Sequence, residues 1–157
     1  MTKKGGKVSV PTWRRSLSKT EYLYQTFQLS IRIGQIVANL PKKYSDSYGN
    51  YLIRTSLEAL KYGQTANDIP INADEDNFKE RRALLRKMHG CINNISTVAY
   101  LYLETARKQD NLPRDKYEKM YDWENEIGEK CYDINKMIRG VAKYDRESFK
   151  KHKKSGD

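Results

Sequence analysis

The sequence predicts an all-α protein, an antiparallel up-down-up-down four-helix bundle with basic, disordered arms at both ends. Apolar residues recur every three or four positions in four stretches, breaks that contain proline separate these stretches, and none alternates as a strand would. Of the 157 residues, 38% are hydrophobic and 32% charged, which is typical of one soluble domain. We therefore expect a basic N-terminal arm at residues 1–17, the bundle at 18–143 and a basic C-terminal tail at 144–157.

The first helix is expected to begin at Ser18 and to end before Pro41. The letters SKTE at residues 18–21 match a capping box, in which a serine and a glutamate side chain satisfy free backbone N–H groups at a helix start. The apolar positions that follow lie on one side of a helix. They include Tyr22, Leu29, Ile33, Ile36 and Leu40.

The second helix is expected at about residues 43–67 and the third from about residue 74 to Gln109. Pro70 lies between them and cannot continue a helix interior. The acidic residues at 74–76 suit the positive end of the third helix dipole. Gly90 inside the third helix costs roughly 1 kcal/mol relative to alanine. A close approach of a neighbouring helix would explain this glycine.

The fourth helix is expected to follow the turn at residues 110–113, because Pro113 suits a first helical position. Its apolar stripe runs from Tyr117 to Val141. Glu124 is the one acid on this stripe, and we expect it to lie at the stripe's edge or to pair with a basic neighbour. The segment from Tyr144 onward has charge without a stripe, so we expect it to be disordered.

The formal net charge of +10 is unevenly placed along the chain. Residues 1–20 carry six basic groups and no acid, and residues 136–157 carry eight basic groups and three acids. The rest of the chain is nearly neutral. Basic ends on a neutral centre favour arms that reach toward a polyanion, and the alternative is a pair of solubilising tails. The basic start has no apolar stretch behind it and no run is long enough to cross a bilayer, so we expect a cytoplasmic protein without a membrane partner.

Motifs for catalysis, metals and cofactors are absent from the sequence. Two histidines are too few for a di-iron bundle, and the two cysteines form no C-x-x-C pair. The sequence has no phosphate-binding glycine loop, no nucleophile elbow and no H-E-x-x-H. His89 could line a cleft as a base, but a boundary position is the simpler interpretation. We therefore expect a non-enzymatic protein with no catalytic residue, metal, cofactor or small-molecule substrate.

Two long charged ridges of opposite sign follow the third and fourth helices. The basic ridge consists of Lys79, Arg82 and Arg86. The acidic ridge consists of Asp115, Glu118, Asp122, Glu126, Glu129 and Asp133. Such ridges are usually solvated faces. The sharper hypothesis is a subunit interface in which the basic ridge of one copy meets the acidic ridge of the next, head to tail, and closes a ring.

The order of these elements resembles a known family of small four-helix bundles. The resemblance covers about residues 20–142 and is carried by LPKKY, YLIRTSLEALKYGQTAND, KERRALLRKMHG and YEKMYDWENEIGEKCYDINKMIRGV. The family includes the accessory variability determinant (Avd) proteins of diversity-generating retroelements and proteins encoded in intervening sequences of bacterial ribosomal RNA genes. The resemblance implies a pentameric ring with a basic exterior, no active site, and a reverse transcriptase and its template RNA or cDNA as partners.

We expect the basic side chains to neutralise phosphates and to give affinity with little sequence reading. The residues expected to contact nucleic acid are Arg14, Arg15, Lys42, Lys43, Arg82, Arg86, Arg139, Lys143, Lys150, Lys151, Lys153 and Lys154. The alternative is a protein-binding scaffold of the ribosomal intervening-sequence type, without a direct nucleic-acid role.

Overall fold

The computed structural model describes residues 20–109 and 111–156, and this part of the chain is all-α. Its elements are α2 (Glu21–Ala38), α3 (Lys42–Tyr44), the π-helical turn η1 (Ser45–Gly49), α4 (Asn50–Asp68), α5 (Glu75–Gln109) and α6 (Arg114–Ser155). The N-terminal arm expected at residues 1–17, with Arg14 and Arg15, lies outside the described residues.

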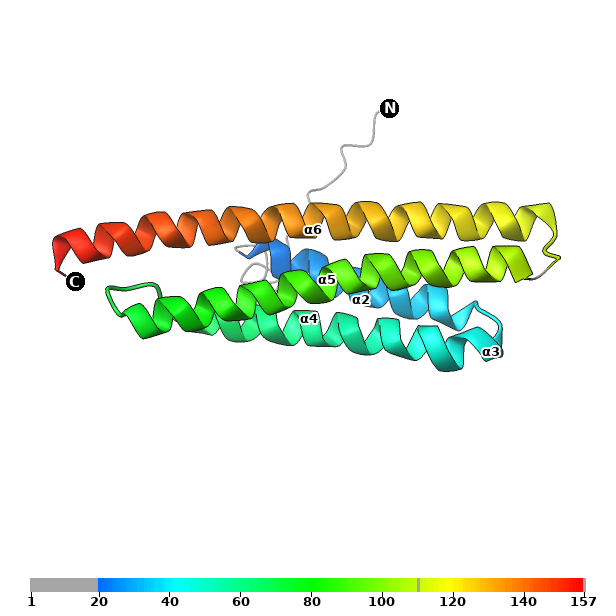
Figure 1. Ribbon diagram of the computed structural model, residues 1–157, viewed down its shortest axis with the longest axis horizontal. Coiled ribbons are helices and arrows are strands. Elements are labelled where there is room, and N and C mark those ends of the chain that lie inside the picture. The colour runs from blue at the N-terminus through cyan, green and yellow to red at the C-terminus, as the bar shows by residue number, and fades with distance from the viewer. Residues whose placement is uncertain (1–19, 110, 157) are drawn as a thin grey trace, which may run out of the picture.

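The four long helices lie side by side along the longest axis of the molecule (Figure 1). Helix α2 contacts α4 and α6, and α5 also contacts α4 and α6, so each helix has two neighbours. The side chains between them form one apolar core that includes Leu29 of α2, Ala59 of α4, Ile92 of α5 and Ile134 of α6. The helical spacing of apolar residues in the sequence therefore corresponds to faces that are buried in the fold.

Helix α2 begins later than the capping box predicts. Glu21 is its first residue, and Thr20 precedes it as the N-cap without a side-chain hydrogen bond to the helix. Glu21 therefore does not occupy the third helical position that a capping box requires. Ser18, the predicted cap of the box, lies outside the described residues.

The second predicted helix is three elements in the structure. Helix α3 follows Pro41, the π-helical turn η1 comes next, and α4 begins at Asn50. Glycines allow this segment to approach its neighbours closely. A Cβ atom on Gly49 would lie 2.7 Å from Val37 Cγ1, and one on Gly63 would lie 2.6 Å from Leu23 Cδ2 and 2.7 Å from Met88 Sδ. No side chain fits at either position without movement of its neighbours.

The close approach predicted at Gly90 is not found. No atom outside the local backbone lies within 4 Å of the position that a Cβ would take there, and the residue is exposed. The prediction was wrong because helical spacing alone did not show that residue 90 faces away from the core.

Helix α6 continues through the segment that the sequence predicts to be disordered. It ends at Ser155, and Gly156 terminates it in the left-handed conformation with φ 76°. Phe149 stacks on Phe78 of α5 with 4.3 Å between ring centroids, and Lys153 Nζ lies 3.5 Å from a carboxylate oxygen of Glu75. The disordered tail was a wrong prediction because these contacts join residues that are far apart in sequence.

Among the described residues, no helix combines the length and the apolar character that a membrane span needs.

Candidate nucleic-acid interface

A basic pocket lies at the seam between α5 and α6. It has a volume of about 520 Å³. Its lining residues are Arg82, Leu85, Arg86, His89, Gly90, Ile138, Arg139, Ala142 and Arg146. We refer to this site as the basic pocket. It brings together three of the residues predicted to contact nucleic acid, Arg82, Arg86 and Arg139.

Helical geometry explains why these side chains converge. Residues 82, 86 and 89 are separated by four and three positions, so they share one face of α5. Residues 139, 142 and 146 share one face of α6 by the same spacing. The two faces meet because Leu85 of α5 and Ile138 of α6 are buried in the core beside them.

The four arginines of the basic pocket make no ion pair with any residue that the structure describes. Arg82, Arg86, Arg139 and Arg146 are all exposed. Each guanidinium is a planar fork of N–H donors that matches phosphate oxygens. A pocket with four such groups and no carboxylate in its lining is suited to a phosphate-rich ligand.

His89 is the only titratable group in this lining besides the arginines. Its possible role as a base in a cleft is one of the sequence-based hypotheses, and the structure places it in the lining of this pocket. Its Nδ1 lies 3.3 Å from the side-chain amide nitrogen of Asn93. The lining contains no serine, cysteine, aspartate or glutamate that could act with it as a nucleophile or a second base. The lining therefore offers His89 no partner for nucleophilic or acid–base chemistry.

The basic surface continues along α6 beyond the pocket. Lys143, Lys150 and Lys154 follow Arg139 at helical spacing, and all three are exposed. From residue 139 to residue 154 the helix rises about 22 Å. Lys153 is already paired with Glu75, and Lys151 lies on a different face of the helix by its spacing. The spacing thus groups Lys143, Lys150 and Lys154 with the pocket and puts Lys151 on another face, whereas Lys153 shares the face of Arg146 but is paired with Glu75.

Lys42 and Lys43 do not join this surface. They belong to α3, which lies at the end of the molecule opposite the C-terminal end of α6 (Figure 1). Lys43 Nζ lies 4.6 Å from the ring centroid of Tyr44. These lysines would have to contact a nucleic acid independently of the basic pocket.

Arg81 has a structural role, although it lies in the basic segment that carries the family resemblance. Its Nε donates to Asp145 Oδ2 at 2.7 Å and its Nη2 to Asp145 Oδ1 at 3.2 Å. Its Nη1 donates to the backbone oxygens of Ala66 at 2.8 Å and Ile69 at 3.2 Å. Only 11% of the Arg81 side chain and 5% of the Asp145 side chain are exposed. Arg81 therefore ties the end of α4 to α5 and α6.

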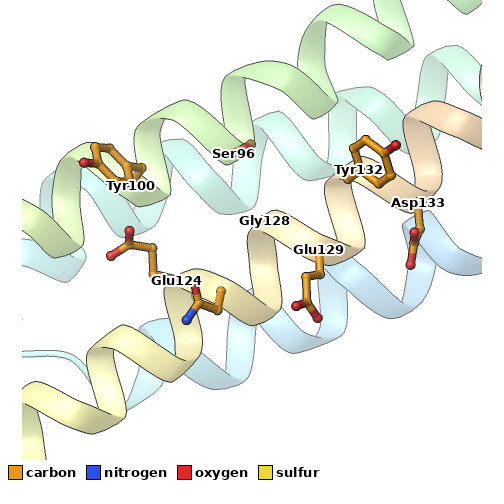
Figure 2. Close-up of a pocket in the computed structure, with 8 residues that line it drawn as sticks. Ser96, Tyr100, Glu124, Gly128, Glu129, Tyr132 and Asp133 are labelled. Atoms are coloured by element: carbon orange, nitrogen blue, oxygen red, sulfur yellow. The ribbon is translucent and has the colours of Figure 1, made fainter.

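A second pocket, of about 490 Å³, lies on the same seam and is acidic. Its lining residues are Ser96, Tyr100, Glu124, Asn125, Gly128, Glu129, Tyr132 and Asp133. We refer to this site as the acidic pocket. Figure 2 shows Tyr100 projecting from α5 and the side chains of Glu129, Tyr132 and Asp133 projecting from α6. Glu129 and Asp133 are exposed and make no ion pair within the described residues.

Glu124 pairs with a basic residue, one of the two alternatives that the sequence leaves open for it. Arg107 Nη2 lies 3.0 Å from Glu124 Oε2 and also contacts a carboxylate oxygen of Glu104. The guanidinium lies 5.1 Å from the ring centroid of Tyr117 and 5.3 Å from that of Tyr121. Only 5% of the Arg107 side chain is exposed. Two carboxylates and two tyrosine rings therefore surround a buried arginine, a cluster that was not predicted from the sequence.

The residues of the acidic ridge lie in different environments in the fold. Glu126 accepts hydrogen bonds from Arg32 of α2 at 2.7 Å and 3.0 Å, and Glu118 accepts one from Arg114 at 3.0 Å. On the basic ridge, Lys79 pairs with Glu75 at 3.0 Å. The ridge residues that stay unpaired in the described chain and border a pocket are Arg82, Arg86, Glu129 and Asp133.

The cysteines are not poised for reaction. Burial raises the pKa of the Cys131 thiol to about 12. Burial and, secondarily, the charge of Glu58 also raise the pKa of Cys91. The thiolate, the reactive form, is therefore scarce at neutral pH. Within residues 20–109 and 111–156, no group of three or more His, Cys, Asp or Glu side chains is placed to hold a metal ion.

Arg146 lines the basic pocket but was not among the residues predicted to contact nucleic acid. It lies seven positions after Arg139, two helical turns along the same face. That spacing was available in the sequence, but the residue belonged to a segment predicted to be disordered.

Comparisons of the chain with protein-family models, with curated proteins and with solved structures found no match.

Proposed function

We propose that this protein is a cytoplasmic, non-catalytic accessory protein that binds the phosphate backbone of RNA or cDNA on an antiparallel up-down-up-down four-helix bundle. The observation that carries the proposal is the basic pocket, where four arginines from two helices converge without a carboxylate partner among the described residues. Arginine forks bind phosphate oxygens through two hydrogen bonds at once. Lys143 and Lys150 extend the same surface along α6.

The partner implied by the resemblance is a reverse transcriptase. In this proposal the protein holds the template RNA or the new cDNA for a reverse transcriptase of a diversity-generating retroelement and supports mutagenic copying. The chain supplies positioning by charge, since phosphate contacts fix orientation and carry no sequence information. The support for this assignment is the sequence resemblance together with the basic pocket.

The test is an RNA-binding titration at several salt concentrations. We expect the logarithm of the affinity to fall linearly with the logarithm of the salt concentration, with roughly 0.7 to 0.9 in slope for each phosphate contact. The variant Arg86→Gln/Arg139→Gln should lower the slope by about 1.4 to 1.8.

The matched control is Arg54→Gln/Lys61→Gln, which removes two exposed positive charges from α4, outside the seam. Its slope should stay close to that of the unchanged protein. An equal loss in both variants would show that net charge, and not the pocket, binds RNA. Absence of binding at about 100 mM salt would contradict the proposal.

A protein-binding scaffold is the second candidate function, and an apolar depression between η1, α4 and α5 favours it. This depression, of about 310 Å³, is lined by Ser47, Tyr48, Tyr51, Val98 and Leu101. Tyr51 is 44% exposed and Leu101 is 52% exposed. Exposed apolar side chains gathered in one place are typical of a protein contact. The same RNA titration separates the candidates, because a scaffold without a nucleic-acid role would not bind.

A further inference from the structure

The basic and acidic pockets lie on one continuous face of the seam between α5 and α6. On α5, residues 82, 86, 89, 93, 96 and 100 are separated by steps of four and three, so they follow one face of the helix. On α6, residues 124, 128, 132, 135, 139, 142 and 146 do the same. The face is therefore basic in one half and acidic in the other.

A pair of asparagines marks the boundary between the two halves. Asn135 Nδ2 donates to Asn93 Oδ1 at 2.7 Å across the seam. Arg86 lies seven positions before Asn93 on α5, and Tyr100 lies seven positions after it. On α6, Arg146 lies eleven positions after Asn135.

Glu124 lies eleven positions before Asn135 on the same helix. The acidic pocket is lined by α6 residues between 124 and 133 and the basic pocket by α6 residues between 138 and 146, so the two pockets lie at similar distances on either side of the asparagine pair. This matched placement is the geometry that a two-fold axis requires of a self-complementary surface.

The acidic pocket has the composition of an arginine-binding site. The unpaired carboxylates Glu129 and Asp133 and the rings of Tyr100 and Tyr132 line the same pocket, with Tyr100 near Glu124 (Figure 2). Tyr100 is 57% exposed and Tyr132 is 63% exposed. Carboxylates bind a guanidinium in its plane and aromatic rings bind its face.

The molecule already encloses an arginine in this way. Arg107 is held by two carboxylates and lies over the rings of Tyr117 and Tyr121. The acidic pocket repeats this combination farther along α6, but no arginine of the described chain occupies it. The basic pocket of a second copy carries arginines that suit this combination of carboxylates and rings.

We propose that two copies of this chain associate face to face through the seam, related by a two-fold axis beside Asn93 and Asn135. The axis lies between the copies and is perpendicular to the helices. It places the basic pocket of each copy on the acidic pocket of the other. The arginines of each copy then contact Glu129 and Asp133 of the other copy. The two-fold axis makes this contact occur twice, once on each side of the axis. This closed pair differs from the head-to-tail ring of the sequence-based hypothesis, because both complementary halves lie on one face.

The face-to-face pair also regulates RNA binding, an inference that rests on the proposed function. RNA and the acidic pocket of a second copy compete for the same arginines. RNA that binds the basic pocket therefore separates the two copies, and a protein without RNA keeps its arginines covered. Because exposed charges dominate this contact, salt also weakens it.

The first experiment uses two charge-reversed variants of the full chain. One variant is Glu129→Lys/Asp133→Lys, and the other is Arg86→Glu/Arg139→Glu. Masses are measured by light scattering over a concentration series at low salt. The unchanged protein should reach twice the chain mass of 18.4 kDa, and each variant alone should stay at 18.4 kDa. Mixing the variants should restore a pair with one copy of each, since both contacts then join opposite charges.

The control Asp115→Lys/Asp122→Lys makes the same change in charge on α6 outside the acidic pocket and should still pair. Circular dichroism verifies that each variant is folded. The proposal is overturned if the unchanged protein stays monomeric, if the mixture stays monomeric, or if the assemblies exceed two copies as a ring would.

The second experiment adds RNA to the unchanged protein and measures RNA binding and pairing together. Bound RNA should lower the paired fraction at least tenfold. Pairing that persists with RNA bound would overturn the proposed regulation alone. Pairing without any RNA binding would instead contradict the proposed function and leave the two-fold contact standing.

Discussion

At the scale of single residues, Arg81 and Asp145 form the polar contact that joins most of the fold. The Arg81 guanidinium binds Asp145 of α6 and two backbone oxygens at the end of α4. Cations stabilise the end of a helix because its last carbonyl groups carry partial negative charge. Because both partners are buried, a substitution that removes one charge leaves the other charge uncompensated and destabilises the fold.

We predict that Asp145→Asn lowers the free energy of unfolding by about 3 to 5 kcal/mol. The amide has nearly the shape of the carboxylate but leaves the Arg81 charge uncompensated in a buried position. Urea unfolding followed by circular dichroism measures the change. The control Glu118→Gln alters an exposed pair with Arg114 and should leave the midpoint unchanged. Equal midpoints for Asp145→Asn and the unchanged protein would contradict the prediction.

At the scale of elements, α4 packs closely because its buried face carries small residues. Ser56, Ala59, Gly63 and Ala66 are buried at spacings of three and four. Small side chains allow helix backbones to approach, and Gly63 has Leu23 of α2 and Met88 of α5 against it. Both neighbours are themselves buried and have little room to move.

We predict that Gly63→Ala destabilises the protein by about 1 to 3 kcal/mol, because the added methyl overlaps Leu23 and Met88. Gly34→Ala is the matched control, since it lies inside α2 with no atom within 4 Å of its Cβ position. That change should stabilise the protein by up to about 1 kcal/mol through helix propensity. Thermal unfolding of both variants measures the difference, and a stabilising Gly63→Ala would show that the helices tolerate a wider separation.

At the scale of the whole molecule, the helices differ greatly in length. Helices α2 and α4 have 18 and 19 residues, whereas α5 has 35 and α6 has 42. The pair formed by α5 and α6 therefore provides a longer surface than the other two helices cover. The basic pocket and the acidic pocket both lie along this pair.

We predict that deleting residues 144–157 destabilises the protein by about 3 kcal/mol or more, because the deletion removes the buried Asp145 and the Phe149 ring. Far-ultraviolet circular dichroism should also show a loss of helix. Deleting residues 156 and 157 alone is the control and should preserve both signals. A dispensable 144–157 segment would restore the sequence-based expectation of a disordered tail.

The predicted and observed elements agree where local signals are strong. Acidic residues and a proline-containing break predicted the third helix from about residue 74, and α5 begins at Glu75. Prediction of the structure failed where contacts between residues far apart in sequence determine it. The stacking of Phe78 on Phe149 joins positions about 70 residues apart, and no local pattern indicates it. Arg82, Arg86 and Arg139 of the basic pocket were predicted from the sequence, while Arg146 and the tyrosines of the acidic pocket were not.

The sequence by itself determined the all-α class and the approximate place of each helix, because periodic apolar residues must be buried on one helix face. Only the tertiary structure decided which charged side chains meet. It buried Arg81 against Asp145, paired Glu126 with Arg32, and left Arg82 and Arg139 facing a common pocket. The physical reason is that electrostatic interaction depends on the distance between groups on different helices. Spacing along one helix does not contain that distance.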